Sequence, residues 1–290
     1  MLRGTTDSEL GGDYGLFPPS SPQSFVELGE RAVATSRPET KIQDYRSILE
    51  LPHGAHLVVV GGQAVSIWAD RYLASEPELR QYLPFTSKDL DLLGDYLDLE
   101  HLAKVTGFKK EPAPHKLLIP SAGYLEIPRA GAQPIKVEVL KRIHGVMTAE
   151  AKATALVVEQ EGIRYRVLHP VILLKAKLEA AIGLPQDKPG QERQDIRHLK
   201  IVLLCVRGFL RELIMTVEAG ELPSRDCVNL LEETMALAMT RSGIKARKKH
   251  GIDWTTVLPI TALEHVSSVK LRNFRDKRLP RWQDTLQSAK

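Results

Sequence analysis

The chain has 290 residues, 43% of them hydrophobic and 26% charged, and a formal net charge of +4, values typical of a globular protein with a core of its own. It contains no run of 18 apolar residues, and its first 24 residues lack the apolar centre of a signal peptide, so neither a transmembrane helix nor secretion is expected. The two cysteines are too few for a disulfide framework and form no Cys-x-x-Cys metal clip, so we expect buried thiols and a cytoplasmic location.

The first half of the chain predicts a mixture of helices and strands. Residues 1–24, rich in Gly, Pro and Ser, are expected to form a flexible tail, with an extended arm as the alternative. Apolar spacing and Gly or Pro breaks then indicate helices over residues 41–52, 63–73 and 99–108, and strands over residues 56–60, 88–94, 115–120, 123–128, 135–143 and 162–169. Gly61 and Gly62 are expected to form the turn between the first strand and the helix after it.

After Pro170 the pattern changes to helix. Four runs show apolar residues at intervals of three and four, the spacing of helices with a buried face: residues 171–184, 192–214, 224–241 and 262–274. We therefore predict an α+β protein. Its N-terminal mixed β-sheet domain with flanking helices would cover residues 25–168, and an all-helical domain would cover residues 169–290.

Positive charge is concentrated at the C-terminal end. Residues 241–290 hold 12 Lys and Arg against 4 Asp and Glu, whereas residues 1–240 hold 28 against 32. A basic segment of this kind is suited to contact with RNA or another polyanion, although a solvated helical face has the same composition.

Two acidic residues in residues 86–94, TSKDLDLLG, are the first sign of catalytic chemistry. In a strand, Asp89 and Asp91 point to the same face, roughly 7 Å apart, where their charges repel each other. A divalent cation such as Mg²⁺ or Mn²⁺, bound by carboxylates and substrate phosphates, would offset that repulsion. The competing interpretation is an exposed edge strand whose two acids are solvated.

A third acid lies in the predicted strand over residues 135–143. Glu138 alternates there with Ile135, Val137 and Val139, which share the opposite face. If this strand lies beside the one that carries the two aspartates, three carboxylates share one face, an arrangement suited to two-metal phosphoryl transfer. A cross-strand partner for a Lys or Arg is the alternative role.

Gly61, Gly62 and Ser87 form a candidate phosphate site. A glycine turn lets phosphate approach the backbone, and the positive end of the following helix attracts anions. Ser87, two residues before Asp89, offers a hydroxyl to the same phosphates, unless it only begins the strand. The sequence has no Gly-x-Gly-x-x-Gly dinucleotide pattern, no Walker Gly-Lys-Ser/Thr and no His-x-x-x-His zinc pair.

The order of these motifs resembles the polymerase-β-like nucleotidyltransferase superfamily, and within it most closely the AbiEii-type abortive-infection and toxin family. That family has a Gly-Gly turn, an Asp-x-Asp strand, a helical lysine motif and a following aspartate motif. Residues 61–64, GGQA, and 87–91, SKDLD, are similar to the first two, and residues 169–183, HPVILLKAKLEAAIG, to the third. The resemblance spans residues 57 to about 200.

The resemblance implies roles for two residues of the helical half. Lys177 occupies the motif lysine and would contact phosphate; it lies among small apolar residues with no acid at helical spacing, although such a lysine can also extend to solvent. Asp195 matches the fourth motif, in residues 192–200, ERQDIRHLK, and is assigned to nucleotide binding. His198 stands where the family usually has a second Asp, a departure that bears on nucleotide specificity.

Together the residues and the resemblance imply a metal-dependent nucleotidyltransferase that moves a nucleoside monophosphate from an NTP to an acceptor. The expected catalytic residues and ligands of Mg²⁺ or Mn²⁺ are Asp89, Asp91 and Glu138, and the expected NTP contacts are Gly61, Gly62, Ser87, Lys177 and Asp195. The resemblance further implies the toxin of a toxin–antitoxin or phage-defence system, with tRNA as acceptor and an antitoxin as partner. The alternatives are a catalytically silent protein that binds nucleic acid or a partner, and a nucleotidyltransferase acting on antibiotics or other small molecules.

Overall fold

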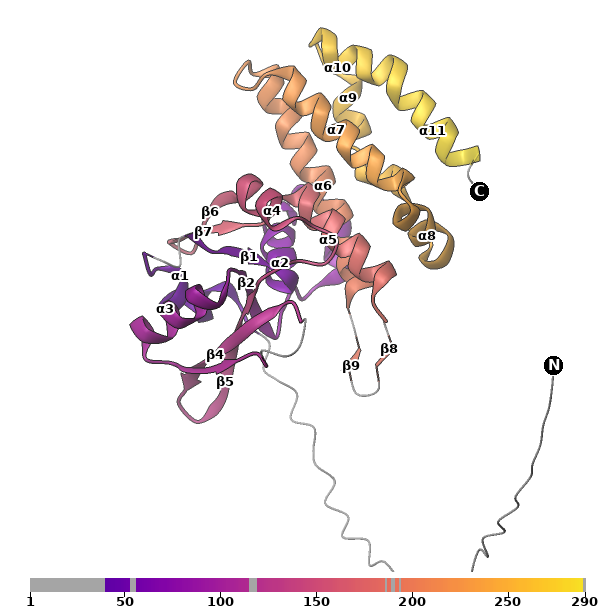
Figure 1. Cartoon of the computed structure of the whole chain (residues 1–290). Helices are drawn as coiled ribbons and strands as arrows, with labels where there is room; N and C mark the ends of the chain where they lie inside the picture. Colours follow the sequence, from indigo (N-terminus) through magenta and orange to yellow (C-terminus); the bar gives the residue numbers. More distant parts are fainter. Residues whose placement is uncertain are drawn as a thin grey trace, which may run out of the picture. The chain divides into compact units, whose positions relative to one another are not determined.

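The computed structural model describes residues 40–52, 56–114, 119–185, 187–188, 191–192 and 194–288, without the side chains of residues 187–188 and 191–192. The predicted tail, and most of the predicted strand over residues 115–120, lie outside the described residues. The described residues belong to one structural unit. The protein is α+β, as predicted, with a seven-stranded mixed sheet followed in the chain by a series of helices (Figure 1).

The sheet has the strand order β3-β4-β5-β2-β1-β7-β6. Its strands are β1 (Val58–Val60), β2 (Asp89–Leu93), β3 (Lys109–Pro112), β4 (Ser121–Arg129), β5 (Ala132–Leu140), β6 (Leu156–Gln160) and β7 (Ile163–Val167). The pairs β2–β5 and β1–β7 are parallel, and the other neighbours are antiparallel. The two acidic strands of the sequence, β2 and β5, are therefore direct neighbours.

The register of β2 and β5 separates an apolar face from a polar one. Leu90 pairs with Val137 and Leu92 with Val139, and all four are buried. Because paired residues lie on the same face of a sheet, the intervening residues share the opposite face. That face carries Asp89, Asp91, Lys136 and Glu138.

Short helices surround the sheet: η1 (Ile42–Tyr45), α1 (Arg46–Leu49), α2 (Gly61–Tyr72), η3 (Pro77–Tyr82), α3 (Tyr96–Thr106) and α4 (Thr148–Thr154). Helix α2 packs on β1 and β2, and α3 packs on β3, β4 and β5. Helix α3 begins at Asp95, whose carboxylate accepts the first backbone N–H groups, and ends at Gly107 in the left-handed region, as predicted.

The second half is helical: α5 (Pro170–Gly183), α6 (Asp195–Glu218), α7 (Ser224–Met239), α8 (Arg241–His250), η4 (Trp254–Val257), α9 (Ile260–Glu264), α10 (Val269–Asn273), η5 (Phe274–Arg278) and α11 (Leu279–Ser288). A two-residue strand pair, β8 (Asp187–Lys188) and β9 (Gln191–Glu192), separates α5 from α6. Helix α6 packs against α5 and α7 and also against α2 of the sheet region (Figure 1).

Several elements differ from the predicted ones. The predicted helix over residues 262–274 is interrupted after Glu264, because the backbone N–H groups of Ser267 and Ser268 donate to the carboxylate of Glu218 instead of continuing the helix. The helix predicted over residues 192–214 corresponds to α6, which begins three residues later, at Asp195, and ends four residues later, at Glu218. Strands β3 and β6 were not expected; they form the two edges of the sheet, where β3 pairs with β4 and β6 with β7.

Polar contacts join α6 to the sheet region. Glu76 is fully buried, and its carboxylate accepts a hydrogen bond of 2.7 Å from Arg207 of α6. Tyr72 of α2 donates to Glu212 of α6 at 2.8 Å. Both cysteines are buried free thiols, as predicted. In the described part of the chain no helix is long and apolar enough to cross a membrane.

Candidate active site

The two glycines form the first residues of α2 rather than a turn before it. Gly61 has φ +66°, and a Cβ placed on it would lie 1.8 Å from Oδ2 of Asp91. Val60, the last residue of β1, pairs with Asp91 across the sheet, which brings this carboxylate to the start of the helix. Only glycine fits position 61, because both the positive φ and the adjacent carboxylate exclude a side chain.

Gly62 lies against two further candidate residues. A Cβ at this position would lie 2.9 Å from Oγ of Ser87 and 3.5 Å from Cε1 of His198. The Ser87 hydroxyl donates to the backbone carbonyl of Asp89 at 2.9 Å. The carbonyl of Ser87 accepts from the backbone N–H of Thr40 at 2.8 Å, so the segment before β1 fixes the entry to β2.

The three predicted carboxylates share one face of neighbouring strands. Asp91 pairs in register with Glu138, and Asp89 lies two residues earlier on β2. All three are half-buried. Burial raises the pKa of Asp91 to about 7, and the nearby charges of Glu138 and Asp89 act in the same direction. As the side chains are placed, no three His, Cys, Asp or Glu groups of the described residues lie close enough together to enclose a metal ion.

Glu138 does not take the alternative role of a cross-strand ion pair within the described residues. The cation beside it on β5, Lys136, lies over the ring of Tyr124, with Nζ 4.0 Å from the ring centroid. The carboxylate of Glu138 is thus left to interact with Asp91 and with whatever binds this face.

Lys177 of α5 forms an ion pair with Asp195, the first residue of α6. The Nζ–Oδ1 distance is 3.4 Å, and each side chain is only about one-tenth exposed. Helical spacing did not reveal this partner, because it lies 18 residues later on another helix. The positive charge of Lys177 also lowers the pKa of Asp91, so the ion pair lies within electrostatic reach of the carboxylates.

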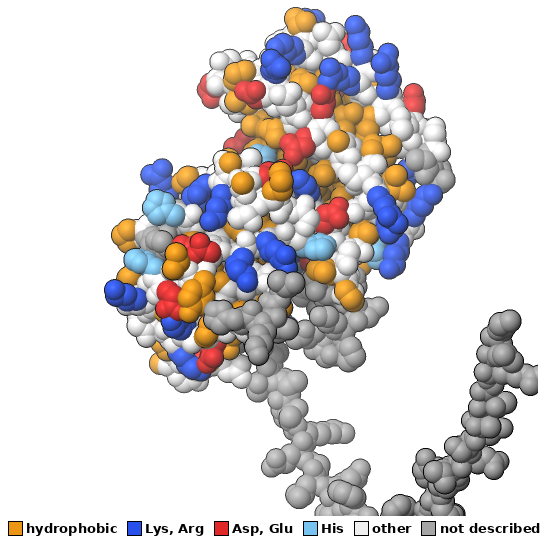
Figure 2. Space-filling view, in the orientation of Figure 1, with side chains coloured by type: hydrophobic (Ala, Val, Ile, Leu, Met, Phe, Trp, Pro, Cys, Tyr) orange, Lys and Arg blue, Asp and Glu red, His pale blue; other side chains and the backbone are white. Residues whose placement is uncertain are grey.

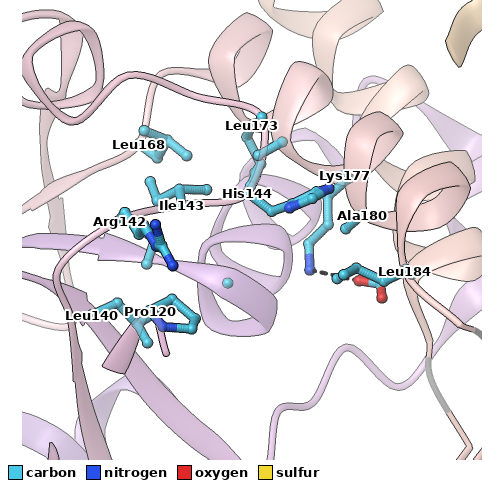
Figure 3. Close-up of a pocket in the computed structure, with 15 residues that line it drawn as sticks. Pro120, Leu140, Arg142, Ile143, His144, Leu168, Leu173, Lys177, Ala180 and Leu184 are labelled. Carbon is cyan, nitrogen blue, oxygen red and sulfur yellow. Dashed lines mark hydrogen bonds and ion pairs between the residues drawn. The ribbon is translucent and has the colours of Figure 1, made fainter. Parts of the chain in front are cut away.

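A cavity of about 620 Å³ opens beside Gly61, Lys177 and Asp195 (Figure 3). Most of its wall is apolar, formed by Leu140, Ile143, Leu168, Leu173, Ala180 and Leu184. Arg142 and Lys177 lie on opposite sides of it, and the dashed line in Figure 3 marks the Lys177–Asp195 pair.

Arg142 and His144 of this wall were not predicted from the sequence. Both lie just after β5, in a segment that packs against α5: a Cβ on Gly183 would lie 2.8 Å from Nε2 of His144. The signal was present in the sequence as a basic run directly after the acidic strand, but no motif singled it out.

His198 of α6 places a neutral ring where the resembled family has an acid. Burial, assisted by the charges of Lys177 and Arg197 and opposed by that of Asp195, lowers its pKa to about 3. The imidazole is therefore uncharged at neutral pH, next to Gly62 at the start of α2. This end of α6 brings one ion pair and one neutral ring to the site.

No protein-family model matches the sequence, and neither does any curated protein. One similar solved structure is that of an antigenic nucleotidyltransferase-like protein from Paracoccidioides brasiliensis, with 12% identity and a TM-score of 0.38 over 58% of this chain and 78% of that chain. Another is the Megavirus polyadenylate synthase, with 13% identity and a TM-score of 0.36 over 61% of this chain but 36% of that chain. Both similarities are remote and assign no activity to this chain.

Proposed function

We propose that the protein is a metal-dependent nucleotidyltransferase that transfers a nucleoside monophosphate from an NTP to an acceptor hydroxyl. The observation that carries the proposal is the pairing of Asp91 with Glu138 on adjacent strands, directly against Gly61 at the start of α2. Carboxylates and a helix start that favours phosphate thus meet at one point, with Lys177 within electrostatic reach. The motif resemblance supports the same chemistry.

The residues present fit a divalent cation. Asp89, Asp91 and Glu138 offer the carboxylate oxygens that Mg²⁺ and Mn²⁺ prefer. Burial, and after it the negative charges of Glu138 and Asp89, raise the pKa of Asp91, and a bound cation would offset these effects. As placed, the three side chains do not by themselves enclose an ion, so they would hold it together with phosphate oxygens of the bound NTP. When bound, such an ion supplies positive charge to the reacting phosphate and its leaving group.

The chain's own groups account for the remaining requirements of the reaction. The backbone at Gly61 and Gly62, together with Ser87 and Lys177, would bind the triphosphate, and the cavity of Figure 3 would receive the nucleoside. Glu138 accepts the proton of the acceptor hydroxyl, whose oxygen bonds to the α-phosphorus. The bond between the α-phosphorus and the bridging oxygen breaks, and pyrophosphate leaves.

The basic face of α8 supports a polyanionic acceptor, which we propose to be tRNA. Exposed cations recur at i, i+4, i+7 and i+8 of this helix: Arg241, Lys245, Lys248 and Lys249. Figure 2 shows Lys and Arg side chains gathered over α8. Helix α8 packs on α5, the helix that carries Lys177. With the resemblance, this favours a toxin of the AbiEii type, neutralised by a cognate antitoxin.

The test is transfer of label from each α-labelled NTP to total tRNA in the presence of Mg²⁺. We expect one NTP to label tRNA with the wild type, and Asp89→Asn and Asp91→Asn each to lower the rate by at least about 100-fold. Asp284→Asn, an exposed change on α11, serves as the matched control. Equal transfer by the wild type and Asp89→Asn would overturn the proposed metal site.

A second candidate is a catalytically silent protein of this fold that binds nucleic acid. The neutral His198 in place of an acid favours it. Calorimetry separates the two: the silent protein would show no Mg²⁺-dependent NTP binding, yet would bind tRNA with an affinity that falls steeply with salt.

A further inference from the structure

A second cavity, of about 350 Å³, borders a different face of α2. Four residues of this helix line it, at i, i+3, i+4 and i+7: Gln63, Ser66, Ile67 and Asp70. The opposite wall comes from three segments distant in sequence, residues 41–43, 83–86 and 160–161. The cavity shares no lining residue with the cavity of Figure 3, and its volume lies within the range of small-molecule sites. We name it the Gln63 pocket.

Gln63 and Ser66 are the buried polar residues on the α2 side of this pocket, and the Ser66 hydroxyl donates to the carbonyl of Gly62 at 3.3 Å. The side chain of Gln63 is only 2% exposed, and its Oε1 has no hydrogen-bond partner among the described residues. A buried acceptor left without a donor costs roughly 1–3 kcal/mol, so its retention calls for a reason. Rotation of the terminal amide about its last side-chain bond can present either the oxygen or the NH₂ group to a ligand.

The rest of the wall indicates what shape of ligand fits. Phe85 is half-buried in the wall, and Leu83, which also lines it, is 49% exposed. Asp70, Glu161 and Lys41 add two acidic groups and one basic group at the same pocket. A flat, partly apolar ring that carries N–H donors satisfies this combination: the ring packs on Phe85 and the N–H groups meet the acceptors.

We propose that the Gln63 pocket binds the base of an amino-bearing nucleoside, such as adenosine, with the exocyclic N–H donated to Gln63 and the ring against Phe85. The pocket adjoins the candidate active site through the chain, because Gln63 follows Gly62 and Thr86 precedes Ser87. A nucleoside bound there requires no phosphate contact. The proposal therefore stands or falls independently of transferase activity.

The test is a titration of isoleucine-methyl-labelled full-length protein with adenosine, followed by NMR. Ile42 and Ile67 line the Gln63 pocket, whereas Ile143 lines the cavity of Figure 3. We expect adenosine to shift the methyl signals of Ile42 and Ile67 and to leave that of Ile143 unchanged. Purine riboside, which lacks the amino group, should bind about 10-fold more weakly than adenosine.

Gln63→Leu removes the acceptor and should weaken adenosine binding by about 10-fold. Its Tm should not fall, because the change removes a buried amide whose oxygen has no partner among the described residues and puts an apolar group of similar size in its place. Phe85→Leu, in a wall that is partly exposed, gives a second variant that keeps the proposal testable if Gln63→Leu fails to fold. Shifts confined to Ile143, no shifts at all, or unchanged affinity in both variants would each overturn the proposal.

Discussion

At the scale of single residues, the candidate site is defined by how closely the backbone of α2 approaches the carboxylates of β2. The sequence alone predicted the shared face of Asp89 and Asp91, because strand alternation is local. It did not predict that Asp91 lies against Gly61, since that contact depends on the pairing of β1 with β2. Nor did it reveal how strongly burial affects His198, whose neighbours come from three elements.

The raised pKa of Asp91 makes the stability of the protein depend on pH. Between its ordinary value of 3.8 and about 7, the folded state binds a proton that the unfolded chain has released, so stability falls as pH rises through this window. Asp91→Asn keeps a neutral group. At pH 8 we expect the variant to unfold at a higher urea concentration than the wild type, with a free energy of unfolding larger by on the order of 2 kcal/mol. The difference is no larger because the carboxyl is partly solvated, and it should shrink toward pH 4.

Urea denaturation at pH 4.5, 6 and 8 measures this effect, with Asp284→Asn as a control at an exposed position. Mg²⁺ adds a second readout: it should raise the Tm of the wild type at pH 8 and have a smaller effect on Asp91→Asn, since the ion binds the folded carboxylates. Parallel stability curves for the wild type and Asp91→Asn would contradict the assigned burial of this group.

Gly61→Ala should destabilise the protein more than the replacement of another glycine that has a similar positive φ. Gly131 has nearly the same φ, +67°, but a Cβ there would meet nothing within 4 Å. Gly131→Ala is thus expected to cost about 1 kcal/mol, the price of a left-handed non-glycine residue. Gly61→Ala adds a clash with Asp91 and should cost at least about 2 kcal/mol more. Thermal unfolding of both variants makes the comparison, and equal losses would show that the close approach is relaxed in solution.

At the scale of elements, local patterns predicted most helices and strands but not their ends or their neighbours. The helix over residues 171–184 and the strand over residues 88–94 follow from apolar spacing and appear as α5 and β2. The break between α9 and α10 was missed, because it depends on Glu218 of a distant helix. The sequence did not predict that β2 and β5 pair in parallel, because strand order is set by tertiary packing rather than by either strand alone.

The Lys177–Asp195 pair joins α5 to α6 in a setting largely shielded from water. Lys177→Met removes the cation from beside a buried carboxylate and should cost about 3 kcal/mol of unfolding free energy. Lys175 on the same helix pairs with Glu150, and their side chains are 31% and 23% exposed, so Lys175→Met should cost under about 1 kcal/mol. Denaturant titration of both variants tests the difference. Similar losses of unfolding free energy in the two variants would mean that the Lys177–Asp195 pair is more accessible to solvent than the structure indicates.

At the scale of the whole molecule, the spacing of apolar residues predicted the α+β class and the change to helix after Pro170. It could not predict that α6 packs against the sheet region, because that packing joins residues more than 100 positions apart. The contacts are those of Glu76 with Arg207 and of Tyr72 with Glu212. The candidate site lies where these two parts of the chain meet. Lys177 and His198 come from the helical half, and the carboxylates come from the sheet.

The uneven charge of the chain leads to a prediction about the acceptor at this scale. If α8 binds the phosphates of tRNA, each phosphate contact releases counterions, and the affinity falls as the salt concentration rises. Removing the four cations of α8 should then make the slope of log K against log salt shallower by up to about 3. The variant carries glutamine at the four exposed positions Arg241, Lys245, Lys248 and Lys249. A control variant removes four exposed cations elsewhere, at Lys270, Arg272, Lys277 and Arg281.

Filter binding of labelled tRNA is measured between 50 and 300 mM salt, over which the Debye length falls by a factor of roughly 2.4. It distinguishes binding to a local surface from a response to net charge. A local surface on α8 predicts weaker binding and a shallower slope for the first variant only. Equal losses in both variants would mean that tRNA responds to overall charge, which leaves the acceptor to be sought among smaller molecules. Helix α8 packs on α5, so a phosphate chain bound along it lies beside the helix that carries Lys177. Loss of tRNA binding should therefore lower tRNA labelling while NTP affinity is retained.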